Sequence, residues 1–147
     1  EPAKSFLELS RANYVPRAST PLLDAIGHAV AEIDKVSLRP GEKIALVILT
    51  DGFENASKEH TKETIKKLLT DRQDNKGWLV TFLGADVDAF TEAQAIGIQG
   101  GKYLHLKKGK LRESMQHAAA SQTRYAQTGN IDLGDFTAEE REDAGKE

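Results

Sequence analysis

The apolar run from Ile44 to Thr50 constrains the fold of this chain more than any other feature of its sequence. Its seven residues are all apolar or β-branched, and none carries a charge. A run of this length, bounded by Pro40-Gly41 and Asp51-Gly52, is typical of a strand covered on both faces, as in the middle of a parallel sheet. Asp-Gly is ordinary turn chemistry. It also places a carboxylate at the carboxyl edge of the strand, where open α/β sheets bind their ligands.

Helices and strands alternate along the rest of the chain. Thr20-Pro21 predicts a helix start with Thr20 as the N-cap, and Ser57 is expected to cap the next helix. The segment Lys102–Leu106 alternates in polarity and contains lysine, which favours the edge of a sheet. The expected elements are a helix over about 21–36, the strand 44–50, a helix over about 58–72, a strand over about 78–84, a short helix through about residue 96, the strand 102–106 and a helix over about 110–127.

This alternation predicts α/β architecture with right-handed crossovers and a mainly parallel sheet. We therefore expect a Rossmann-like fold with three layers, α/β/α. Only three strands are present, and the most apolar strand comes first. Because an unpaired apolar edge invites aggregation, we expect a further segment to pair with Ile44–Thr50, either from upstream of Glu1 or from another chain.

The composition excludes several classes of function. The net charge of −3 provides no basic surface for nucleic acid or an anionic membrane, and the absence of cysteine excludes thiolate chemistry. No apolar stretch approaches the ~20 residues needed to cross a bilayer. The chain contains no nucleophile elbow, no phosphate-binding glycine loop and no zinc spacing among its four histidines. Since no signal peptide is visible, we expect a cytoplasmic protein that binds neither nucleic acid nor membrane.

Residues 129–147 differ in composition from the rest of the chain. They contain seven acidic and two basic residues, which predicts an acidic, mostly flexible C-terminal tail. Thr137 and Glu140 have the spacing of a capping box and allow one helical turn. The α/β domain is therefore expected to span residues 1–128.

Two motifs resemble the signatures of a known family. The first is Tyr14-x-Pro16-x-x-x-Thr20-Pro21-Leu22-x-Asp24-Ala25-Ile26, and the second is Val47-Ile48-Leu49-Thr50-Asp51-Gly52-x-Glu54-Asn55. Both resemble signatures of the von Willebrand factor A domain, and Phe82-Leu83-Gly84-Ala85 is similar to its later part. The resemblance covers about residues 10–127 and is strongest to the stand-alone bacterial and phage members. It implies a partial domain, because the first strands of the family are missing from this chain.

The resemblance also implies a metal-ion-dependent adhesion site. In the family, Mg²⁺ is held by an Asp-x-Ser-x-Ser loop, a threonine and an aspartate, and by position the last two are Thr20 and Asp51. Mg²⁺, or Mn²⁺ or Ca²⁺ in its place, prefers such hard oxygen ligands. The Asp-x-Ser-x-Ser motif does not occur here, so upstream or partner residues would complete the site. The alternatives are that Thr20 is only a cap and Asp51 only a turn residue.

Four further acidic residues lie near these motifs. We expect Asp24 to be a first-turn acid favoured by the helix dipole. Glu54 either contacts water bound to the metal or is exposed to solvent. Asp86 and Asp88 are expected to cap a helix, with a place on the rim of the site as the alternative.

Three functions follow from these observations. The first is a metal-dependent protein-binding module, for adhesion or scaffolding, in which an acidic residue of a protein partner completes the coordination of the metal. The second is an enzyme for metal-assisted phosphoryl transfer or hydrolysis, which we disfavour because no general base or nucleophile can be named. The third is a scaffold with a vestigial metal site, whose function is the completion of its sheet by another chain.

Overall fold

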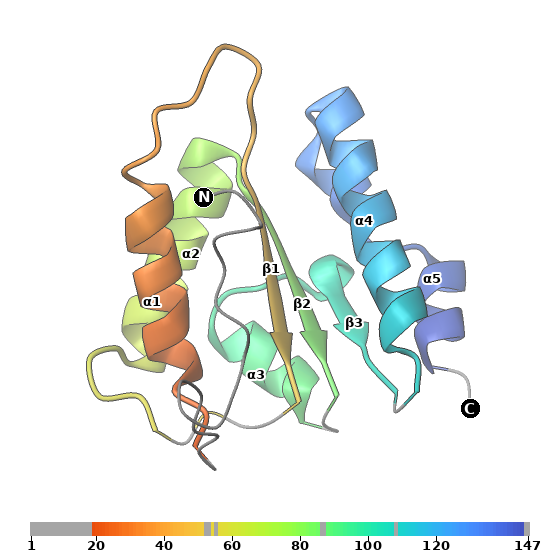
Figure 1. The fold of residues 1–147 in the computed structure, drawn as a ribbon, viewed down its shortest axis with the longest axis horizontal. Helices are drawn as coiled ribbons and strands as arrows, with labels where there is room; N and C mark the ends of the chain where they lie inside the picture. Colours follow the sequence, from red (N-terminus) through yellow and green to blue (C-terminus); the bar gives the residue numbers. More distant parts are fainter. Residues whose placement is uncertain (1–18, 52–53, 55, 86–87, 108, 146–147) are drawn as a thin grey trace, which may run out of the picture.

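The computed structural model describes residues 19–51, 54, 56–85, 88–107 and 109–145, and within them the fold is mixed α/β. Three strands form one open, all-parallel sheet in the order β1-β2-β3. The described elements are α1 (Leu22–Ile33), β1 (Ala45–Thr50), α2 (Lys62–Lys76), β2 (Leu79–Gly84), α3 (Ala89–Ala95), the 3₁₀ helix η2 (Gly100–Lys102), β3 (Tyr103–His105), α4 (Leu111–Thr128), the 3₁₀ helix η3 (Ile131–Gly134) and α5 (Ala138–Gly145) (Figure 1).

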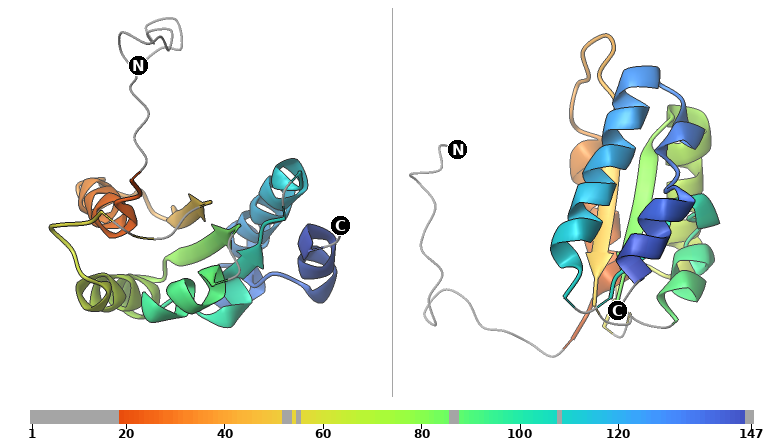
Figure 2. Two further views of the ribbon diagram at one scale, coloured as in Figure 1. Left: turned by 90° about the horizontal axis from the view of Figure 1, so that it is seen from below. Right: turned by 90° about the vertical axis from the view of Figure 1, so that its right-hand side faces the viewer.

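The sheet separates two hydrophobic cores, so the expected Rossmann-like arrangement of three layers is confirmed. On one face, Val80 and Phe82 of β2 pack in a cluster with α1, α2 and α3. On the other face, Leu83 packs with Leu104 and with residues of α4 and α5. Alternate side chains of a strand point to opposite faces, so the continuous apolar run of β2 supplies both cores. Helices α1 and α2 lie on one side of the sheet, and α4 and α5 lie on the other (Figure 2).

The two outer strands differ in how well they match the expectation from sequence. The short strand β3 lies at one edge of the sheet, as predicted. The apolar strand β1 lies at the other edge, so the expectation that it lies in the middle of the sheet is wrong for the part of the chain that the structure describes. Its Leu49 is 47% exposed and Ala45 is also exposed. Nothing in an apolar pattern distinguishes an inner strand from an edge strand that lacks its neighbour.

The starts of α1 and α2 differ from the prediction. Pro21, not Thr20, is the N-cap residue of α1. The N-cap residue makes no capping hydrogen bond through its side chain. Helix α2 begins at Lys62, and Thr61 forms a capping box with Thr64. The expected cap, Ser57, lies four residues before Thr61 and accepts a hydrogen bond from α1 instead.

The C-terminal residues correct the expectation of a flexible tail. Residues 131–145 form η3 and α5, and Phe136 and Ala144 are buried in the second core. The predicted capping box is confirmed: the Thr137 N–H donates to Glu140, and the Glu140 N–H donates to Thr137 Oγ1. Arg124 of α4 pairs with the Glu140 carboxylate at 2.8 Å. A cation from an earlier helix therefore pairs with one of the acidic residues of this segment.

A lysine that is almost completely buried also fixes this segment. Lys102 is 1% exposed, and its Nζ lies 2.8 Å from Asp135 Oδ1. A buried charge requires such a partner. The Phe136 N–H donates to the Gly101 carbonyl beside it, so η2, which directly precedes β3, is joined to the C-terminal segment through backbone and side chain.

The spacing of Leu111, Met115, Ala118, Gln122 and Tyr125 predicts an apolar stripe on one face of helix α4, and the helix buries only Ala118 and Tyr125 of this stripe. Its buried residues are Ser114, Ala118, Ser121 and Tyr125. Leu111 and Met115, expected in the stripe, are 50% and 44% exposed.

Among the described helices, none combines the length and apolar character needed to cross a membrane.

Candidate site at the carboxyl edge of the sheet

Thr20 and Asp51 come from separate loops at the same end of the molecule. Thr20 directly precedes the N-cap residue of α1, and Asp51 directly follows β1 and is exposed. The first turn of α1 and the carboxyl ends of the parallel strands lie at this end (Figure 1). Tyr14 and Pro16 of the first motif lie outside the described residues, as does Gly52 of the second. The role of Thr20 and Asp51 as metal ligands remains a prediction.

The Glu54 carboxylate ties the loop after β1 to the start of α1. Its Oε2 accepts the Leu23 N–H at 2.8 Å, and its Oε1 accepts the N–H groups of Ala56 and Ser57. The Ser57 hydroxyl donates to the same carboxylate and accepts the Asp24 N–H at 3.0 Å. The first N–H groups of a helix have no partner within it, so Glu54 and Ser57 cap α1 from a distant loop.

Asp24 completes a reciprocal arrangement. Its carboxylate accepts the backbone N–H groups of Lys58, Glu59 and His60 at 2.8–3.0 Å. The first turn of α1 and the loop before α2 thus satisfy backbone donors of each other. Sequence reasoning treated Asp24 as a first-turn acid and Glu54 as exposed or near the metal, and it missed this exchange because hydrogen bonds between distant loops leave no spacing signal.

The hydrogen bonds shift the acidity of both carboxyl groups in the same direction. The N–H of Lys58, followed by those of His60 and Glu59, lowers the pKa of Asp24 against a smaller effect of burial. For Glu54, burial is the largest single effect and raises the pKa. The combined hydrogen bonds from Leu23 and Ser57 and from the Ala56 N–H outweigh it and leave the pKa lowered. Both groups are therefore carboxylates at neutral pH.

Acidification is expected to loosen this junction. Because the folded pKa values of Asp24 and Glu54 lie below their ordinary values of 3.8 and 4.5, their contribution to stability is present above those values. It is lost as the pH falls through the lower folded values. We expect the urea midpoint of wild type to fall between about pH 5 and about pH 3, and the fall to be shallower in Glu54→Gln. Parallel curves for the two proteins would contradict this assignment.

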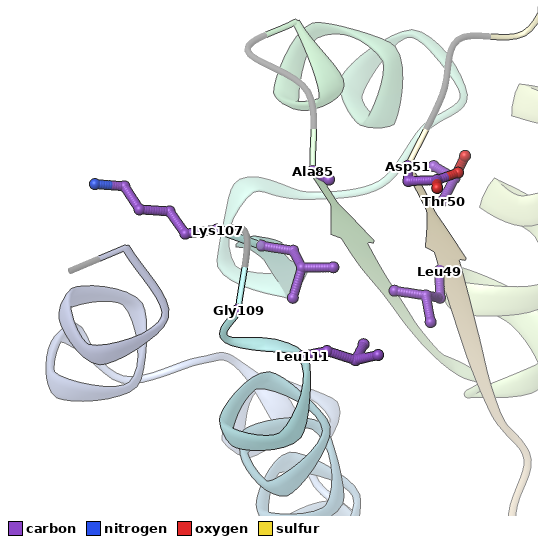
Figure 3. Close-up of a pocket in the computed structure, with 8 residues that line it drawn as sticks. Leu49, Thr50, Asp51, Ala85, Lys107, Gly109 and Leu111 are labelled. Carbon is purple, nitrogen blue, oxygen red and sulfur yellow. The ribbon is translucent and has the colours of Figure 1, made fainter. Parts of the chain in front are cut away.

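A groove of about 600 Å³ lies beside Asp51, between the ends of β1 and β2 and the start of α4. Leu49 and Leu111 point toward each other across it, whereas the Lys107 side chain extends away (Figure 3). Ala85 and Leu106 complete its apolar lining. The site therefore combines an exposed carboxylate with an adjacent apolar surface.

The described residues alone supply few metal ligands. Within the described ranges, no group of three or more His, Cys, Asp or Glu side chains is arranged to hold a metal ion. One carboxylate and one hydroxyl are too few for the six oxygens that Mg²⁺ prefers, even with bound water. Asp86 lies outside the described residues. Asp88 is the N-cap residue of α3 but makes no capping hydrogen bond through its side chain.

Comparison with known proteins adds no assignment, because no family model, curated protein or solved structure matches this chain.

Proposed function

We propose that this chain is part of a metal-dependent protein-binding module of the von Willebrand factor A type. The observation that carries the proposal is the exchange of hydrogen bonds by Asp24 and Glu54, which holds the loops of Thr20 and Asp51 at one rim. Carboxylates at this rim favour a divalent cation, and a hydroxyl and a carboxylate suit Mg²⁺. An acidic side chain of a protein partner would then complete the coordination shell.

The remaining metal ligands would come from a strand added to the free edge of β1. Such a strand, if parallel to β1, would end beside Asp51, and the loop that follows it could supply further oxygen ligands. This is the position of the missing Asp-x-Ser-x-Ser loop in the family that the sequence resembles. The exposed Leu49 at this edge supports the need for such a neighbour.

Mn²⁺ titration followed by NMR tests the metal site in this chain, because paramagnetic broadening reports even weak binding. We expect Mn²⁺ to broaden the amide signals of Thr20 and Asp51 and their neighbours first, and an excess of Mg²⁺ to reverse the effect. Asp51→Ala should abolish the broadening, whereas the control Asp88→Ala should retain it. Broadening that is centred elsewhere, or unchanged in Asp51→Ala, would refute the site.

A scaffold with a vestigial metal site is the second candidate. The free edge of β1 favours it, because completion of the sheet by another chain requires no metal. A chain that shows no local Mn²⁺ broadening but binds a partner equally well in EDTA would support the scaffold over the metal-dependent module.

A further inference from the structure

The outer edge of β1 carries a regular set of backbone donors and acceptors. The N–H of Leu79 donates to Ile44 O, and the N–H of Ala85 donates to Thr50 O. In a parallel ladder, the backbone groups of alternate residues point to opposite neighbours. The N–H and C=O groups of Ala45, Val47 and Leu49 therefore point away from β2, and no described strand pairs with them.

Within the described strand, the edge lacks two features that commonly prevent pairing. The six residues of β1 include no charged residue and no proline, both of which often protect edge strands. Two of the three outward-directed residues, Ala45 and Leu49, are exposed, and Val47 is partly buried against the second core. All three side chains lie on the α4 face of the sheet.

The charges at the two ends of β1 are complementary to each other. Lys43 precedes the strand and Asp51 follows it, and both are exposed. Lys43 belongs to the α4 face, where its Nζ lies 5.9 Å from the centre of the Tyr125 ring. Asp51 is an even number of residues away from Lys43, so the alternation of a strand directs both side chains to the same face. Asp51 also lines the groove on that face. A strand that runs in the opposite direction with the same sequence would therefore meet each charge with its opposite.

We propose that this chain dimerises by antiparallel pairing of β1 with β1 of a second copy, centred on Val47. In this register Val47 lies opposite Val47 of the second copy, Ala45 opposite Leu49, and Lys43 opposite Asp51. The outward backbone groups of both strands then bond to each other. A shift by one residue would place side chains on the wrong faces, and a shift by two would separate Lys43 from Asp51.

The dimer joins the two sheets into one and covers apolar surface. The twofold axis of an antiparallel pair stands perpendicular to the sheet, so both α4 helices lie on the same face of the joined sheet. Leu49 and Leu111, about half exposed in the single chain, line the groove next to this edge. The inference goes beyond the proposed function, because the second copy and a strand carrying metal ligands would occupy the same edge and exclude each other.

Disulfide cross-linking tests the register directly, because the chain contains no cysteine. Opposite residues of a hydrogen-bonded antiparallel pair are ~5.5 Å apart at Cα, within the range of a disulfide. Under oxidation in EDTA, Val47→Cys should form a covalent dimer. Ala45→Cys and Leu49→Cys should each remain monomeric on denaturing gels when alone, and should cross-link when mixed. Since Ala45 and Leu49 are exposed, these two variants are expected to fold.

Charge reversal gives an independent measurement by sedimentation, also in EDTA. Lys43→Glu and Asp51→Lys should each weaken dimerisation by about tenfold, and the double variant should restore it to within about threefold. A monomeric chain at about 100 µM would overturn the proposal, as would larger assemblies or dimers that do not follow this cross-linking pattern. Because no metal is present, failure here leaves the Mn²⁺ test of the proposed function unaffected.

Discussion

Replacing Phe136 by alanine is expected to lower the free energy of unfolding by about 3–5 kcal/mol, the usual cost of removing a buried aromatic ring. Phe136 is 3% exposed and packs with Leu83, Leu104 and Ala118 in the second core. Domains of this size are stable by only about 5–15 kcal/mol, so the loss is a large fraction of the total. Urea denaturation followed by circular dichroism measures it.

The matched control for this prediction is Leu133→Ala in the same segment. Leu133 is 47% exposed, so its truncation should cost less than about 1 kcal/mol. If both variants unfold at the same urea concentration as wild type, the C-terminal segment does not pack against β3 and α4. In that case the flexible tail expected from the composition would be correct.

Replacing Glu54 by alanine is expected to lower the free energy of unfolding by about 2–3 kcal/mol. The change leaves the N–H groups of Leu23, Ala56 and Ser57 without their acceptor. Hydrogen bonds to a charged group are worth about 1.5–3 kcal/mol each, and we expect water to replace part of them because the site is only half-buried. Glu54→Ala also removes a negative charge from the N-terminus of α1, where the helix dipole favours a negative charge.

Glu54→Gln separates the two contributions of this side chain. Glutamine retains one acceptor oxygen but no charge, so its loss of stability should be about half that of Glu54→Ala. Amide exchange should accelerate in the first turn of α1 in Glu54→Ala, while α2 keeps its protection through the capping box of Thr61. An alanine variant as stable as wild type would show that Glu54 does not hold the two loops together.

The sequence predicted element types better than their surroundings. The apolar runs identified β1 and β2, and helical spacing identified α1 and α4. The sequence could not predict that β1 lies at an edge, because the exposure of a strand depends on what lies beside it. For the same reason the sequence could not predict that the apolar residues Leu111 and Met115 are exposed.

The wrong predictions for the C-terminal segment and for the residues near the site have the same cause. The acidic composition of 129–147 indicates repulsion within the segment, but two of its acidic residues pair with Lys102 and Arg124, which come from earlier elements. Likewise, Ser57 and Glu54 cap a helix about 30 residues away rather than the next one. Composition and local spacing report interactions between near neighbours, whereas these contacts arise only when the chain has folded.

The packing of β3 against the segment after α4 has a consequence for folding during synthesis on the ribosome. The second core requires Phe136 and Ala144, which are translated long after β2 and β3. Until residues 131–145 leave the exit tunnel, Leu83 and Leu104 lack part of their cover and Lys102 lacks Asp135. The nascent chain would therefore complete its packing only late in translation, and chaperones that bind apolar segments have an interval in which to engage it.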